Sequence, residues 1–213
     1  MPRAALLVSL VLVGLALAAS AWLYPVLPDQ IPTHWNIHGE ADGFGPKAVA
    51  AWILPAVALG VIAFLRAVPW LSPQGYAVDV HGRAFGGLVV ALTALFVFIH
   101  LLSLVAALRP GLAVDRALVA GVMLALGAIG LTFDGLKRNF FIGIRVPWTI
   151  ASDRVWDETH RLAARIWPAA GLAGACLAAF GLTLPAFLML VPMVGVPIVY
   201  SFVRSKALER GGP

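Results

Sequence analysis

Six apolar runs, each about twenty residues long, constrain this chain more than any other feature. They cover residues 4–26, 49–68, 85–108, 114–133, 164–182 and 184–203. A helix of about 20 residues crosses the hydrocarbon core of a bilayer, and it satisfies its backbone hydrogen-bonding groups within itself. The runs are solidly apolar, without the alternation typical of barrel strands. The sequence therefore predicts an all-α polytopic membrane protein with about six transmembrane helices, forming one membrane domain over residues 1–213.

The composition supports a membrane protein over a soluble one. Only 12% of the residues are charged and 61% are hydrophobic, whereas soluble domains carry about 25% charged residues. A net charge of +5 is also seen in nucleic-acid-binding proteins, but basic residues beside membrane spans explain it better. We therefore expect the lipid bilayer as a partner and no direct nucleic-acid binding.

The distribution of basic residues predicts the orientation. Cytoplasmic loops of membrane proteins are enriched in Lys and Arg. With the N-terminus inside, twelve of the fifteen Lys and Arg residues fall in cytoplasmic segments, and the exceptions are Lys47, Arg109 and Arg116. Both termini are thus predicted to be cytoplasmic. The first run has features of a signal peptide, but it stays apolar as far as Val26, which predicts an uncleaved helix.

The last two runs are joined by almost nothing beyond Thr183 and Pro185, which predicts a tight hairpin. Pro192 and Pro197 predict a kink in the final helix. His100 lies inside the third run, and ionisable groups at such depth are often functional. The alternative is a neutral histidine that donates a hydrogen bond to a neighbouring helix.

The first external loop, residues 28–47, predicts a compact extracytoplasmic cap. It contains three prolines and three glycines, which favour tight turns and stiff backbone. Its polar side chains suggest either a metal site or hydrogen bonds within the loop, and they are His34, His38, Glu40 and Asp42. Gly39 and Pro32 argue against the regular helix that paired histidine ligands would use. We expect no cofactor, and no nucleophile motif suggests catalysis.

Residues 134–163 form a cytoplasmic loop whose second half predicts an amphipathic interfacial helix before the fifth span. Ser152 is the expected N-cap, with Trp148 and Trp156 at headgroup depth. A polar cluster facing the cytoplasm is expected from Arg138, Asn139, Arg145, Trp148 and His160. Its expected carboxylate partners are Asp134, Asp157 or Glu158. The alternative is a basic segment bound to acidic lipid headgroups.

Both loops resemble the SdpI family of bacterial membrane proteins. The cap resembles the small N-terminal module common in that family, in the string from Ile31 to Asn36 and in Gly39, Asp42, Gly43 and Lys47. The inner loop resembles the family's core segment, in the string from Arg138 to Arg145 and in Pro147-Trp148-Thr149, Ser152, Val155-Trp156 and Thr159-His160-Arg161. Phe140 stands where the family pattern has a tyrosine or tryptophan.

The resemblance implies a multi-pass protein of the bacterial cytoplasmic membrane that gives immunity against a membrane-active peptide toxin, or senses one, and that recruits a cytoplasmic repressor. The residues it marks for ligand or partner binding are His34, Asn36, Asp42, Lys47, Arg138, Asn139, Arg145, Trp148, Thr149, Trp156 and His160. Two other functions stay open. One is a small transporter or channel-like protein, which His100 would suit, and the other is an interfacial enzyme acting on a lipid or peptide. No catalytic motif supports the enzyme, so we expect a binding protein.

Overall fold

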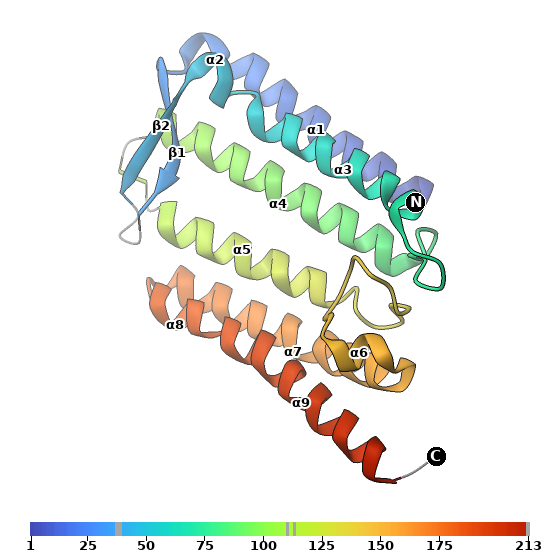
Figure 1. Cartoon of the computed structure of the whole chain (residues 1–213). Coiled ribbons are helices and arrows are strands. Elements are labelled where there is room, and N and C mark those ends of the chain that lie inside the picture. Colours follow the sequence, from blue (N-terminus) through green and yellow to red (C-terminus); the bar gives the residue numbers. More distant parts are fainter. Residues whose placement is uncertain (37–39, 110, 113, 212–213) are drawn as a thin grey trace.

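A computed structural model gives the structure of residues 1–36, 40–109, 111–112 and 114–211. Long helices lie side by side in it (Figure 1). They are α1 (Arg3–Leu23), α3 (Ile53–Leu71), α4 (Arg83–Leu108), α5 (Val114–Gly130), α7 (Asp153–Ala179) and α9 (Leu190–Gly211). The shorter elements are a 3-10 turn η1 (Tyr24–Val26), strands β1 (Gln30–Trp35) and β2 (Ala41–Pro46), and helices α2 (Lys47–Ala50), α6 (Pro147–Ala151) and α8 (Thr183–Leu188). The prediction of an all-α polytopic membrane protein is confirmed.

Five helical stretches are long and apolar enough to cross a membrane, by length and composition. They are Arg3–Val26, Lys47–Leu71, Arg83–Leu108, Asp153–Ala179 and Thr183–Arg210. The fourth predicted run is shorter than expected, because α5 ends at Gly130 after 17 residues. The chain turns there, and the N–H groups of Thr132 and Phe133 donate to the carbonyls of Ile129 and Gly130. Even so, α5 lies between α4 and α7 and packs against both (Figure 1).

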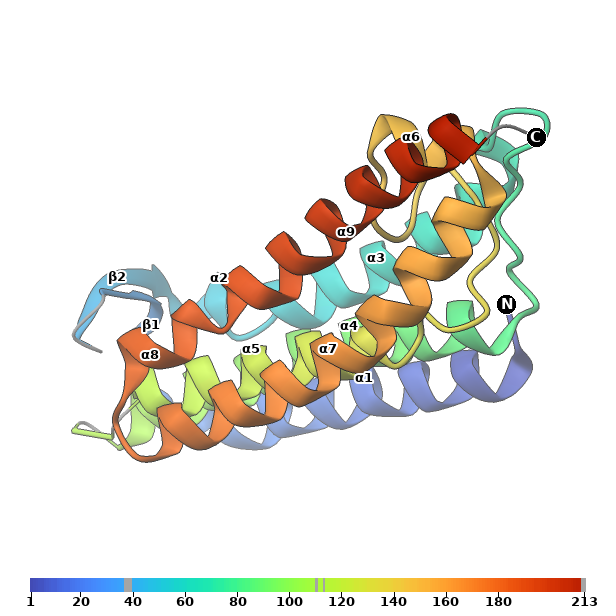
Figure 2. The same cartoon turned by 90° about the horizontal axis from the view of Figure 1, so that it is seen from below.

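The helices run alternately in opposite directions, so that both termini lie at one end of the bundle. Figures 1 and 2 show the N- and C-termini together at the end opposite the β1–β2 hairpin. The loop between α5 and α6 is at the same end as the termini (Figure 1). This arrangement agrees with the positive-inside count, which assigns the termini and that loop to the cytoplasm.

The predicted amphipathic helix before the fifth span is present, and it continues into that span without a break. The amphipathic segment and the fifth span form one continuous helix, α7, that starts where Ser152 accepts a hydrogen bond from the N–H of Val155. No residue between the two segments breaks a helix, and Pro168 lies inside α7 without ending it. The polar first half of α7 is therefore rigidly joined to the apolar second half.

The predicted tight hairpin and kink lie at the start of the last span. Gly181 has φ +81°, a conformation that residues with a side chain rarely adopt, and it reverses the chain between α7 and α8. The helix is interrupted at Met189, between α8 and α9. Pro192 lies three residues further on and has no N–H for the carbonyl of Leu188, so it favours a break at this point.

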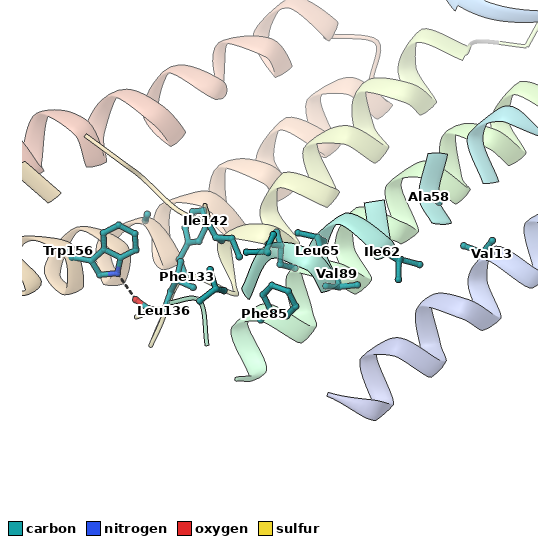
Figure 3. Packing of buried hydrophobic residues seen from close by; sticks show 14 residues of the cluster. Val13, Ala58, Ile62, Leu65, Phe85, Val89, Phe133, Leu136, Ile142 and Trp156 are labelled. Atoms are coloured by element: carbon teal, nitrogen blue, oxygen red, sulfur yellow. Dashed lines mark hydrogen bonds between the residues drawn. The ribbon is translucent and has the colours of Figure 1, made fainter. Parts of the chain in front are cut away.

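The main hydrophobic core joins the cytoplasmic loop to four helices (Figure 3). Val13, Ile62, Phe85 and Val89 come from α1, α3 and α4. The buried loop side chains Phe133, Leu136 and Ile142 pack in the same cluster as Trp156 of α7. Trp156, expected at headgroup depth, faces the protein interior and not lipid, because its side chain is fully buried and its indole N–H donates to the carbonyl of Leu136.

Candidate functional site

The external cap is a β-hairpin fastened to the helices beneath it. Strands β1 and β2 pair in antiparallel fashion. Ile31 is fully buried beside Leu104 of α4, and the Ser103 hydroxyl donates to the carbonyl of Pro32 at 2.6 Å. The ammonium of Lys47 lies 3.0 Å from the carbonyl oxygen of Leu27 and 5.0 Å from the ring centroid of Tyr24. Lys47, predicted to bind a ligand, thus holds the base of the cap.

His34 and Asp42 form a pair on the exposed side of the hairpin. The His34 Nδ1 atom lies 2.5 Å from a carboxylate oxygen of Asp42, and both side chains are accessible to solvent. The strand register puts Gly43 opposite His34, where a Cβ would lie 2.8 Å from the His34 Cβ, so glycine is required for this pairing. Within the described residues, no group of three or more metal-ligating side chains gathers. His38, the other histidine of the predicted metal set, lies outside them.

Asn36 and Glu40 link the two ends of the hairpin loop. The Asn36 backbone N–H donates to the Glu40 carbonyl at 3.0 Å, and its side-chain amide donates to the Glu40 carboxylate at 3.0 Å. The Glu40 backbone N–H in turn donates to the Asn36 side-chain oxygen at 3.1 Å. These bonds favour the loop-internal role of the cap's polar groups over a metal site.

A groove of about 430 Å³ lies between the hairpin and the outer ends of α4 and α5. The hairpin contributes Trp35, Glu40 and Phe44, and the helix ends contribute Arg109 and Val114. Phe44 exposes 57% of its surface although it is a large apolar side chain. The volume of the groove falls within the range of about 300–1,000 Å³ that is usual for ligand sites. Trp35 and Phe44 are large aromatic residues in an otherwise polar loop, but the groove also depends on Arg109, about seventy residues later in the chain.

Beneath the cap, His100 takes part in a buried hydrogen-bond chain. The Ser20 hydroxyl on α1 donates to the carbonyl of Ala51 at 2.6 Å and lies 2.7 Å from Nε2 of His100 on α4. The Ala51 carbonyl needs an external donor because Pro55, four residues later, has no N–H. His100 thus links α1, α4 and the break before α3, which agrees with the expectation of a histidine bonded to a neighbouring helix.

On the cytoplasmic side, Asn139 organises the inner loop. Its side-chain amide donates to the carbonyls of Lys137 and Ile142 at 2.9 and 3.2 Å. Its side-chain oxygen accepts from the N–H groups of Phe141 and Ile142 at 2.9 and 2.8 Å. The side chain is almost fully buried. All four of its hydrogen-bonding positions are therefore used within the loop.

His160 holds the next turn of the loop against α7. Its Nε2 atom accepts from the N–H of Ile144 at 2.9 Å, and Nδ1 donates to the carbonyl of Trp156 at 2.8 Å. The imidazole stacks on the Trp156 indole with centroids 4.0 Å apart. Gly143 has φ +102°, and a Cβ there would clash with the His160 ring. Glycine is thus needed at this position for two reasons.

Thr149 closes the same loop from α6. Its hydroxyl accepts from the Val146 N–H at 3.0 Å and lies 2.8 Å from the Ile144 carbonyl. The side chain is fully buried. Thr149, Asn139, Trp156 and His160, all predicted to bind a ligand or partner, therefore have their hydrogen-bonding groups occupied inside the chain.

The predicted cluster of Arg138, Arg145 and Trp148 does not form as expected. Arg138 pairs with Asp153 at 2.6 Å, and Asp153 was not among the predicted partners. Arg145 is exposed and donates to a backbone carbonyl, that of Phe140, at 2.6 Å. Trp148 points away to α9, where its indole N–H donates to the Ser201 hydroxyl at 2.6 Å. The loop spreads these side chains over different neighbours because its centre is filled by apolar residues.

A connection between α7 and α9 was missed by the sequence interpretation. Glu158 accepts from Arg204 with both carboxylate oxygens and also from Arg154 at 3.0 Å. The Tyr200 hydroxyl lies 3.3 Å from the same carboxylate. Glu158 was expected to pair with the basic residues of the inner cluster, but it connects the last helix, α9, to α7 through Arg204. A separation of 46 residues between Glu158 and Arg204 gave no local signal for this pair.

Comparison with known proteins gives matches to the region of the cap and to the region of the inner loop. A family model described as the SdpI/YfhL protein family matches residues 135–201, and one for a domain of unknown function (DUF1648) matches residues 11–59. Immunity protein SdpI of Bacillus subtilis is 24% identical over 177 residues, which cover 82% of this chain and 81% of that protein. The chain is similar to the SdpI family. No solved structure matches the chain at a significant level.

The apolar helices and the similarity to SdpI identify the chain as a multi-pass protein of the cytoplasmic membrane. The SdpI/YfhL match begins in the inner loop and runs through α7 and α8 into α9. The match to the domain of unknown function covers most of α1, the hairpin and the start of α3. One side of the groove beside the cap is formed by the hairpin, which lies within the N-terminal match. The other side is formed by the ends of α4 and α5, which lie between the two matched regions.

Proposed function

We propose that this chain is a membrane immunity protein that binds a membrane-active peptide from outside the cell, at the groove beside its cap. The observation that carries the proposal is the groove itself, with Trp35 and Phe44 on a hairpin that is fastened to the bundle. Sequence similarity supports it, because a relative of similar length is named an immunity protein.

The groove suits part of a peptide lying at the membrane surface. Aromatic side chains favour the interface between lipid and water, where a membrane-active peptide first accumulates. The lining is mainly apolar, and Glu40 and Arg109 supply one charge of each sign. A volume of about 430 Å³ takes a few side chains rather than a whole peptide. Recognition of a short segment at this groove follows from that size.

The inner loop is the candidate surface for a cytoplasmic regulator. The loop is held rigidly by Asn139, Thr149 and His160, and it leaves Phe140 and Arg145 exposed on its surface. Aromatic residues and arginine are enriched at protein interfaces. An exposed aromatic ring and an exposed guanidinium on a rigid loop therefore suit a surface that binds a partner. Recruitment of a repressor would use these two side chains rather than the buried ones.

A survival assay with matched phenylalanine variants tests the peptide-binding proposal. A sensitive host lacking its own immunity protein would be challenged with the toxin countered by the Bacillus subtilis protein, which serves as the positive control. Phe44→Ala should abolish protection, because it removes an apolar wall of the groove. Phe180→Ala should leave protection intact, because Phe180 is even more exposed, at 83%, but lies at the α7–α8 turn outside the groove.

Two results would contradict the proposal. Equal protection by both variants, at equal membrane abundance, would exclude the groove as the binding site. Ion or solute flux through proteoliposomes containing the wild-type chain, unaffected by Phe44→Ala, would favour the small transporter instead.

A further inference from the structure

A large cavity lies at the cytoplasmic end of the bundle, away from the cap and next to Asp134, the first residue of the inner loop. It has a volume of about 870 Å³ and is bordered by α1, α4 and α5. Gly87, Ala91 and Ala94 on α4 line it, together with Ala5 on α1 and Ala128 on α5. Its lining is almost entirely apolar, so it suits hydrocarbon.

Small side chains create this groove. At Gly86 a Cβ would lie 3.2 Å from the Cβ of Ala5, and at Gly87 a Cβ would lie 2.9 Å from a methyl group of Thr132. The two consecutive glycines therefore let α1 and the turn after α5 approach α4 from two sides. Further along α4, Ala91 and Ala94 are too short to fill the space between these walls.

The length of the groove matches one leaflet of a bilayer. On α4 it runs from Arg83, the first residue of the helix, to Ala94. Eleven steps along an α-helix cover about 16 Å. Half of the hydrocarbon core is about 15 Å thick. Since Arg83 is at the cytoplasmic end, the groove extends through the inner leaflet from the headgroup level.

The cytoplasmic rim of the groove carries one charge of each sign. Arg83 and Asp134 both line it at this end. Both side chains are exposed, and neither has a hydrogen-bond or ion-pair partner among residues 1–36, 40–109, 111–112 and 114–211. The N-terminus of α4 adds partial positive charge next to Arg83. The rim is thus complementary to a group that carries a negative and a positive charge.

We propose that this groove binds a phospholipid whose headgroup carries both a phosphate and an ammonium, as phosphatidylethanolamine does. Acyl chain occupies the small-residue groove, the phosphate lies at Arg83, and the ammonium lies at Asp134. The paired charges favour this lipid over an anionic lipid, which Asp134 would repel. They also favour it over a helix of a second copy, whose apolar surface would leave both charges without partners.

Electron spin resonance of the purified full-length chain tests the proposal. Phosphatidylethanolamine and phosphatidylglycerol, each with a nitroxide in the middle of an acyl chain, serve as probes in detergent micelles. The wild-type chain should show a saturable immobilised signal with the first probe, displaced by unlabelled phosphatidylethanolamine. Ala94→Trp and the milder Ala128→Leu should remove that signal by filling the groove. Ala56→Trp, on an exposed position of α3, should retain it.

The charges are tested separately in the same assay. Arg83→Gln should weaken binding of both probes about fivefold, the factor that corresponds to about 1 kcal/mol for one basic residue near a phosphate-rich surface. Asp134→Asn should weaken only phosphatidylethanolamine and should reverse the preference between the probes. Monodispersity and a cooperative thermal transition would be required of each variant before comparison.

Three outcomes would overturn the proposal. An equal immobilised signal in the folded Ala94→Trp, Ala128→Leu and Ala56→Trp variants would mean nonspecific boundary lipid. A stronger signal for phosphatidylglycerol than for phosphatidylethanolamine in the wild-type chain would contradict the paired-charge site. A change of oligomeric mass in Ala94→Trp without any change of lipid signal would assign the groove to a second copy.

Discussion

Replacing Asn139 with alanine distinguishes a structural inner loop from a binding site. The four hydrogen bonds of its side chain connect Lys137, Phe141 and Ile142 within one turn. Each such bond contributes about 0.5–1.5 kcal/mol net, so their loss together would cost about 4 kcal/mol. That is a large part of the ~5–15 kcal/mol that stabilises a typical domain. Asn139→Ala should therefore destabilise the chain severely.

Membrane abundance and the midpoint of thermal unfolding in detergent measure this effect. Lys137→Ala is a suitable control, because its side chain lies two residues away but is 75% exposed. The control should unfold at nearly the wild-type temperature. Asn139→Asp should destabilise at least as strongly as Asn139→Ala, because it loses both donors and places a buried carboxylate oxygen against the carbonyls of Lys137 and Ile142.

The reasoning fails if Asn139→Ala unfolds like the wild-type chain but no longer protects the host. That result would mean that the amide acts on a partner, as the family resemblance first implied. Loss of protection in proportion to loss of folded protein would instead support the structural role.

Three further predictions concern the cap, the inner surface and the orientation. His34→Ala and Asn36→Ala should reduce protection more than His38→Ala at matched abundance, and equal tolerance of all three would make the loop a passive connector. Arg145→Lys should retain most of the protection and Arg145→Ala should lose it. The reason is that the exposed guanidinium donates to a single backbone carbonyl, and lysine can do the same. Equal loss of protection in both variants would indicate a partner bound by both prongs of the guanidinium. Reporter fusions after Arg210 should be active in the cytoplasm, and a tag in the 33–47 loop should be labelled from outside; the reverse pattern would invert the orientation.

The membrane spans could be predicted because solid apolar runs leave few alternatives to a helix in lipid. Boundaries were less certain where adjoining segments both favour a helix, so α7 was divided into two although nothing interrupts it. The end of α5 was also misplaced, because Leu131 and Phe133 are apolar but belong to the following turn.

The cap and the inner loop show why site geometry was harder to predict. Strands β1 and β2 contain Pro and Gly, which hide the alternation by which strands are recognised. Trp156 was assigned to the membrane surface by residue type, yet it shares a helix face with the buried Ala163. Pairs such as Glu158 and Arg204 depend on how distant helices pack, which a single sequence does not specify.

The bond between Ser20 and Ala51 determines where a proton resides on His100. The serine hydroxyl has one hydrogen, and that hydrogen is committed to the Ala51 carbonyl. Nε2 of His100 must then be the protonated nitrogen, since the serine oxygen is left to accept. Replacing Pro55 with alanine would supply a backbone N–H to the same carbonyl. Ser20 could then donate to the imidazole, and His100 would adopt its other tautomer. A substitution at Pro55, 45 residues away in the sequence, would thus change which nitrogen of His100 carries the proton.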